Sequence, residues 1–289
     1  MPPRILIFVA LSGDGSRAAA GAACERATAG TARPLSLAAS AAPAAVLRAG
    51  DVLAADLDLR PIAGELALLA HVTALMRERP DALLAIDSTD PARLVALMSA
   101  ADLARARLDA ARPPAGTSTL AAQRAGAAPH LTALQAAAAA GDLLRAPELT
   151  SVGLLAGPSP AEGAEARARE ALAFAGLTVA TGLLPPTPAA AAQALEGAGG
   201  VAALALDPAP FSVATPGGAE VHLPLPTVPD DLRAVRSGQE LALHAGGATR
   251  RLRAPASLGA LVPGAVSAGD DGAVVVRFVS PGSAGTSDA

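Results

Sequence analysis

Hydrophobic and polar positions in the first half of the chain alternate between two periodicities. Short runs that are almost entirely apolar are typical of strands buried on both faces of a sheet. Longer segments with an apolar residue every three or four positions are typical of helices. The predicted strands span residues 5–11, 34–39 and 83–86, and the predicted helices span residues 15–28, 62–79 and 91–104. This alternation predicts an α/β fold, with a parallel sheet that helices cover on both faces.

The same alternation returns after Thr150. The predicted strands there span residues 151–157, 177–184 and 201–206, and the predicted helices span residues 161–175 and 188–195. The pattern changes beyond about Arg236. The runs ELALHAG, TRRLRAP and AVVVRFVSP, which Gly-rich turns connect, indicate short antiparallel strands.

These patterns divide the chain into parts. We expect a Rossmann-like domain over residues 1–165, a reduced C-terminal α/β domain over residues 166–280 that ends in short antiparallel strands, and a disordered tail over residues 281–289.

Composition excludes some classes of function. The formal net charge of −4 gives no basic surface for nucleic acid. Cys24 is the single cysteine, so no disulfide can form within the chain, and a reducing, cytoplasmic setting is favoured. The uncharged stretch 171–195 is long enough for a membrane span, but its three prolines would leave backbone groups unpaired in lipid. The N-terminal apolar run is too short for a signal peptide. We therefore expect a soluble chain.

The first candidate site is the loop that follows the first predicted strand. Ser12, Gly13 and Asp14 stand between that strand and the next helix. In open parallel sheets, ligands bind at the carboxyl ends of strands, and glycine lets the backbone approach a ligand closely. Because Ser and Asp are also favoured helix N-caps, a capping role alone is the alternative.

The second candidate site is the turn DSTDP. Asp87 directly follows the predicted strand 83–86, and Asp90 precedes Pro91, at the start of the next helix. A carboxylate in this position could accept a proton from an attacking hydroxyl. The alternative is that Asp90 only caps the helix through its side-chain oxygen.

Metal and cofactor chemistry find little support in the sequence. The four histidines are scattered without the spacing of a zinc site. The chain also contains no P-loop, no GxSxG elbow and no dinucleotide fingerprint after a strand. We expect neither a metal nor an organic cofactor.

Several motifs occur in the order found in one enzyme family. The chain resembles lipid-A-disaccharide synthase, an inverting glycosyltransferase of the GT-B class. The family's SGD loop corresponds to Ser12–Asp14, and its GxxE segment corresponds to Gly64 and Glu65, which are adjacent here. Its RPDxxxxIDxPDF signature corresponds to Arg79–Pro91. Its WAWR, VGHP, LPGSR and VPT elements correspond in turn to Ser118–Arg124, Leu155–Pro158, Leu184–Pro188 and Leu225–Pro229. The WAWR element lacks both tryptophans here, the VGHP turn lacks its histidine, and LPGSR reads LPPTP.

This resemblance implies a function and a role for each matching residue. It implies the transfer of a 2,3-diacylglucosamine unit from UDP to 2,3-diacylglucosamine 1-phosphate in lipid A biosynthesis. Asp90 matches the general base. Substrate contacts are implied for Ser12, Gly13 and Asp14, for Asp87 and for Arg124. The substrates imply a cytoplasmic enzyme with peripheral contact to the inner membrane.

Two alternatives stay open. One is a folded relative of this family that no longer catalyses the transfer. The other is a two-lobed small-molecule binding protein of the periplasmic-binding-protein type, because the segment 151–184 is similar to the entry into the second lobe of such folds.

Overall fold

The chain forms two units in its computed structural model. They comprise Met1–Leu172 with Gly176–Ala205, and Ala173–Ala175 with Leu206–Ala289. The structure describes residues 5–11, 15–26, 33–37, 50, 53–54, 59–111, 129–156, 161–202, 211–215, 218–223, 231–237, 240–245, 248–253, 258–268 and 274–280.

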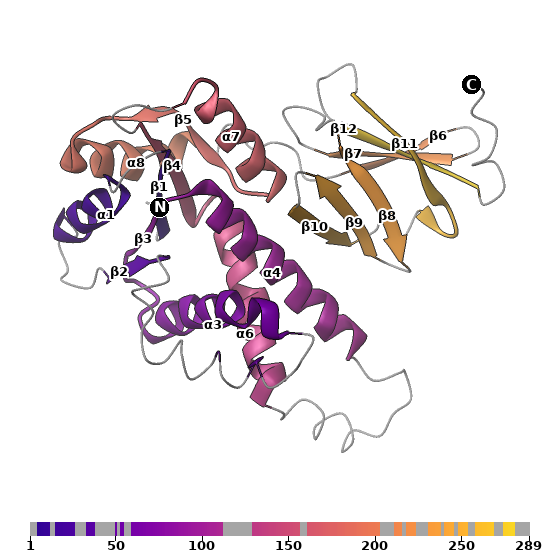
Figure 1. The fold of residues 1–289 in the computed structure, drawn as a ribbon, viewed down its shortest axis with the longest axis horizontal. Coiled ribbons are helices and arrows are strands. Elements are labelled where there is room, and N and C mark those ends of the chain that lie inside the picture. The colour runs from indigo at the N-terminus through magenta and orange to yellow at the C-terminus, as the bar shows by residue number, and fades with distance from the viewer. Residues whose placement is uncertain are drawn as a thin grey trace. The chain divides into compact units, whose positions relative to one another are not determined.

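A five-stranded parallel sheet is the centre of the first unit (Figure 1). Its order is β2-β3-β1-β4-β5, with β1 (Ile5–Ala10), β2 (Arg33–Ser36), β3 (Leu84–Ser88), β4 (Thr150–Leu155) and β5 (Val179–Leu184). Every residue of β1, β3 and β4 is buried. Such strands have solvent on neither face, which explains their almost continuous apolar sequences. The predicted α/β fold with a parallel sheet is therefore confirmed, and it is compatible with a Rossmann-like arrangement.

Helices cover both faces of this sheet (Figure 1). One face carries α1 (Gly15–Arg26) and α8 (Pro188–Ala202), and the other carries α3 (Ala63–Glu78), α4 (Pro91–Ala110) and α6 (Pro129–Arg145). The 3₁₀ turn η2 (Arg60–Ile62) leads into α3, and α7 (Ala164–Phe174) connects β4 to β5.

Small side chains set the closest helix contacts in the first unit. In α1, Ala19, Ala20 and Ala23 pack against Leu6 and Phe8 of β1. Alanine adds little bulk at such an interface, so the helix can lie close to the sheet.

The contact between α4 and α6 combines a glycine with a buried ion pair. A Cβ atom added to Gly141 would lie 2.6 Å from the Cβ of Ala101. Nearby, Arg145 Nη1 donates to Asp102 Oδ1 at 2.7 Å, and Asp102 is 2% exposed. These contacts fix α6 against α4.

Antiparallel strands form the described part of the second unit. A four-stranded sheet has the order β11-β12-β7-β6, and a three-stranded sheet has the order β10-β9-β8. The bounds are β6 (Phe211–Thr215), β7 (Gly218–Leu223), β8 (Arg233–Ser237), β9 (Glu240–Ala245), β10 (Ala248–Arg253), β11 (Val262–Ala268) and β12 (Val274–Val279). Their core includes Val221, Leu241, Leu243, Val276 and Phe278. The predicted short antiparallel strands are confirmed.

The division of the chain differs from the expected one. We expected the first domain to end at residue 165, but the first unit continues to Ala205. The reason is that β5 pairs in parallel with β4 and extends the same sheet. The described strands after this point are antiparallel, whereas a reduced α/β domain was expected.

Two local expectations also need correction. A strand was predicted over residues 201–206, but residues 201 and 202 lie in α8, and residues 203–206 fall outside the described part. Helix α6 was not predicted, although Leu134, Ala137, Ala138, Gly141 and Leu144 follow a helical spacing and are buried. The predicted disordered tail, residues 281–289, lies outside the described residues.

Within the described part of the chain, no helix is both long enough and apolar enough to cross a membrane.

Candidate functional site

The carboxyl ends of the three central strands meet at one edge of the sheet. Val9 of β1 pairs with Ser88 of β3, and Ala10 of β1 pairs with Leu155 of β4, so the three strands end at the same level. Helices α1 and α4 begin within a few residues of this edge. The edge of a parallel sheet where strands end and helices begin is the usual ligand position in such folds.

The structure brings together the strands that carry both predicted sites. Asp87 lies within β3, because this strand extends two residues beyond its predicted end, and Asp90 follows it. The Ser12–Gly13–Asp14 segment follows β1, the neighbour of β3. Ser12, Gly13 and Asp14 themselves lie outside the described residues, as does Arg124. The roles of these four residues therefore stay predictions.

Asp87 is the buried carboxyl group of this edge. It is 3% exposed, and its Oδ2 accepts a hydrogen bond from Ser36 Oγ of β2 at 3.0 Å. Arg17 Nη2 of α1 lies 3.4 Å from the same serine hydroxyl and donates to it. The serine thus connects a cation on α1 with a carboxyl group on β3.

The environment of Asp87 favours its protonated form. Burial raises the pKa of Asp87 above the usual range of an aspartate, because removal from water penalises the charge. The hydrogen bond from Ser36 and the nearby charge of Arg17 oppose this shift in pKa. A buried carboxyl group with a raised pKa at a strand end is a feature of functional sites, where burial and neighbouring groups shift the pKa values of acids and bases.

Asp90 is exposed and caps α4. Its Oδ1 accepts a hydrogen bond from the backbone N–H of Ala92 at 2.8 Å, and its backbone is extended, as in a helix N-cap. Ser88 Oγ donates to the backbone oxygen of Asp90 at 2.8 Å. Asp90 is therefore the N-cap of α4, and its role as a general base stays a prediction. The cap uses Oδ1, and Oδ2 makes no hydrogen bond to the described part of the chain.

An ion pair between α3 and α4 supports the turn. Arg93 Nη1 donates to Glu65 Oε1 at 2.6 Å. Glu65 lies in the first turn of α3, and Arg93 is three residues beyond Asp90. The pair fixes the start of α4, so the position of Asp90 depends on helix packing as well as on its cap.

Sequence reasoning missed three polar residues at this edge. Ser36 and Arg17 contact one another beside Asp87. Ser16, in the first turn of α1, is fully buried, and its hydroxyl has no hydrogen-bond partner in the structure. A signal for Ser36 existed, because it is the polar residue of the second predicted strand, 34–39, and parallel strands end at the same edge. Nothing in the sequence separated Ser16 from an ordinary helix residue.

The residues that the structure describes contain no cluster of three or more histidine, cysteine, aspartate or glutamate side chains that could hold a metal ion.

No protein-family model matches the chain, and no curated protein matches it either.

Proposed function

We propose that the chain is a divergent glycosyltransferase of the lipid-A-disaccharide synthase type, with the acceptor sugar held at the carboxyl edge of the parallel sheet. The observation that carries this proposal is the pairing of β1 with β3, which brings the Asp87–Asp90 turn next to the end of the strand before the Ser12–Asp14 loop. The Asp87–Asp90 turn lies at the end of the segment 56–90, which most resembles the family, and Ser12–Asp14 matches the family's first loop.

The proposed chemistry uses Asp90 as the general base. Its exposed Oδ2 takes the proton of the acceptor hydroxyl while that oxygen attacks the anomeric carbon of the donor sugar. The bond from this carbon to the UDP oxygen breaks, and UDP leaves with inversion of configuration. The hydrogen bond from Ala92 to Oδ1 holds the carboxylate in one orientation, which supports this role.

Asp87 has a different proposed role. Because it is buried and already accepts the Ser36 hydroxyl, it positions β2 against β3 and keeps Ser36 and Arg17 at the rim. Arg17 is exposed and donates a hydrogen bond to Ser36, and its other N–H groups can approach the acceptor phosphate. The proposed partners are therefore a UDP-sugar and an acylated glucosamine phosphate, at the cytoplasmic surface of the inner membrane.

The two-lobed binding protein receives no specific support. That architecture requires a second lobe built on a parallel sheet, and the described strands of residues 206–289 are antiparallel. The proposal for the glycosyltransferase depends on the first unit alone and assigns no residue to the UDP pocket.

The test is the release of UDP from UDP-2,3-diacylglucosamine in the presence of 2,3-diacylglucosamine 1-phosphate. The wild-type protein should release UDP and form the disaccharide, and Asp90→Asn should lose this activity. Asparagine caps a helix as well as aspartate does, so the variant keeps α4 while it loses the base.

Asp81→Asn is the matched control. Asp81 is exposed and precedes β3, at the opposite end of the same strand, so its loss should leave UDP release unchanged. A folded wild-type protein that releases no UDP contradicts the transferase proposal. Full activity in Asp90→Asn contradicts the role of Asp90.

A further inference from the structure

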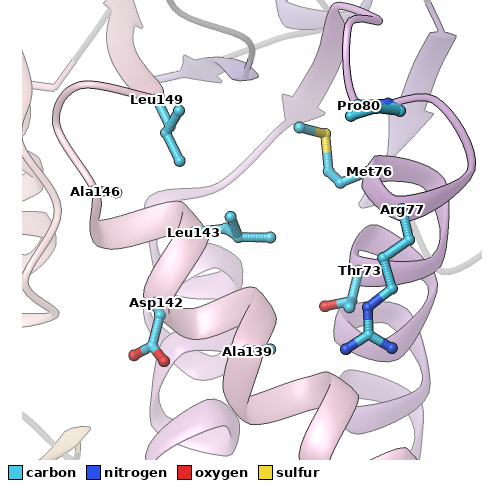
Figure 2. Close-up of a pocket in the computed structure, with 9 residues that line it drawn as sticks. All are labelled: Thr73, Met76, Arg77, Pro80, Ala139, Asp142, Leu143, Ala146 and Leu149. Carbon is cyan, nitrogen blue, oxygen red and sulfur yellow. The ribbon is translucent and has the colours of Figure 1, made fainter.

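A pocket lies at the other edge of the sheet, between α3 and α6. Its volume is about 540 Å³, and Figure 2 shows the residues that line it: Thr73, Met76, Arg77, Pro80, Ala139, Asp142, Leu143, Ala146 and Leu149. Pro80 precedes β3, and Leu149 precedes β4. The pocket is therefore at the amino ends of these strands, away from Asp87 and Asp90, and a ligand there is independent of the proposed transferase function.

The interior of this pocket is apolar. Figure 2 shows Leu143 extending from α6 toward α3, Met76 rising from α3 beside Pro80, and Leu149 on the side of α6. Ala139 of α6 and Ala146, directly after that helix, are too small to fill the space. No aromatic side chain is among the lining residues. Such a cavity suits a thin, flexible hydrocarbon chain better than a polar metabolite, because a polar ligand would lose its hydrogen bonds to water there.

Two of the polar groups at the pocket are already engaged. The hydroxyl of Thr73 donates to the backbone oxygen of Ala136 at 2.7 Å. The Asp142 carboxylate forms an ion pair with Arg105 of α4. These two groups therefore do not need a ligand as a hydrogen-bond or ion-pair partner.

Arg77 is the third polar side chain that lines the pocket. It is exposed on α3, and its guanidinium forms no ion pair or hydrogen bond with the described part of the chain. In Figure 2 its side chain runs along α3 beside Thr73. An arginine without a partner at the rim of an apolar pocket favours a planar anion such as a carboxylate, which its two N–H groups can bind together.

We propose that this pocket binds a long-chain fatty carboxylate. The hydrocarbon chain occupies the space between Met76, Leu143 and Leu149, and the carboxylate pairs with Arg77 at the rim. A fatty carboxylate supplies hydrocarbon to fill the space between the helices. It also supplies an anion to pair with the guanidinium.

Calorimetric titration with dodecanoate tests the pocket and its specificity for the head group. The wild-type protein should bind dodecanoate, and affinity should rise by about fourfold for each methylene added from octanoate upward. Dodecanol, which has the same chain without the charge, should bind at least about tenfold more weakly. No binding of dodecanoate overturns the proposal, and equal binding of the alcohol overturns the role of the carboxylate.

Two variants with matched controls locate the ligand. Arg77→Gln should weaken dodecanoate binding at least about tenfold, whereas Arg79→Gln, which alters a nearby exposed arginine outside the pocket, should not. Ala139→Leu fills the pocket and should abolish binding, whereas Gln135→Leu adds the same side chain at an exposed position of α6 and should leave it intact. Unchanged binding in Ala139→Leu places the ligand elsewhere and overturns the proposal.

Methionine methyl NMR gives a readout that needs no variant. The chain has three methionines, of which Met76 lines the pocket and Met98 is fully buried in α4. Dodecanoate should shift the methyl signal of Met76 and leave that of Met98 in place. A shift of Met98 alone, or of neither signal at saturation, contradicts binding between α3 and α6.

Discussion

Two buried aspartates in the first unit have opposite surroundings. Asp102 lies between α4 and α6, is 2% exposed and forms an ion pair with Arg145. Asp87 lies at the carboxyl edge of the sheet and is 3% exposed. Its carboxyl group accepts a hydrogen bond from the neutral hydroxyl of Ser36, and burial raises its pKa.

The difference separates a structural carboxylate from a candidate functional one. At a helix interface, a buried charge is tolerated when a cation satisfies it. At the end of a strand, a buried carboxyl group without a direct ion pair lowers the stability of the fold. Such groups are found where a protein binds a ligand or transfers a proton. The predictions below test this contrast.

The largest expected effect is the loss of Arg145. Arg145→Ala leaves the Asp102 charge buried without its partner and should lower the free energy of unfolding by about 3–5 kcal/mol, measured by urea denaturation. Arg105→Ala breaks an ion pair whose side chains are 48% and 63% exposed, and it should cost less than about 1 kcal/mol. Equal losses in the two variants would show that the buried pair has no special structural role.

The second effect tests the close contact beside this ion pair. In Gly141→Ala, the added Cβ would lie 2.6 Å from the Cβ of Ala101, so α4 and α6 must separate. The cost should be about 1–3 kcal/mol in thermal or urea unfolding. Gly64→Ala in α3 is the control, because its Cβ meets nothing within 4 Å, and it should be neutral or stabilising. A neutral Gly141→Ala would mean that the interface is loosely packed.

The third effect concerns the cap of α4. Asp90→Ala removes the acceptor for the Ala92 N–H and should lower the free energy of unfolding by about 1 kcal/mol. Asp90→Asn should change it by only a few tenths of that amount. If both variants lose the same stability, the carboxylate charge rather than the cap stabilises the turn.

The smallest effect is the pH dependence from Asp87. Because the folded-state pKa of Asp87 is raised, its protonated form favours the fold. This contribution is fully present below the unfolded pKa of about 4, and it is lost as the pH rises through the folded pKa. Asp87→Asn should therefore be stabilised relative to wild type at neutral pH, with the difference shrinking toward acid pH. Urea midpoints across this range measure it, and a variant less stable than wild type at neutral pH would contradict the direction.

Much of the first unit could be predicted from its sequence. The runs that became β1, β3 and β4 are continuous and apolar because these strands are buried on both faces, and their predicted bounds agree within two residues. The cap at Asp90 could also be predicted, because Asp-Pro before a helical pattern is a local signal for a helix start.

Other features depend on contacts between distant segments. The insertion of β3 between β1 and β2, and the extension of the sheet by β5, follow from strand pairing that no local pattern records. The contact of Ser36 with Asp87 joins residues that are 51 positions apart. This contact forms because β2 and β3 pair, and the sequence of neither strand predicts that pairing. The prediction of a strand over residues 201–206 is wrong for residues 201 and 202, because an apolar, Ala-rich run is equally compatible with the end of α8.

Amide chemical-shift mapping during titration with glucosamine 1-phosphate tests most directly whether the carboxyl edge is the ligand site. This soluble compound carries the sugar and the phosphate of the proposed acceptor. The perturbed amides should belong to Leu11, Gly15, Ser36 and Ser88, while Ala82 and Leu149 at the amino edge stay in place. Perturbation confined to Ala82 and Leu149, or none at a saturating concentration, would contradict the assignment of the site.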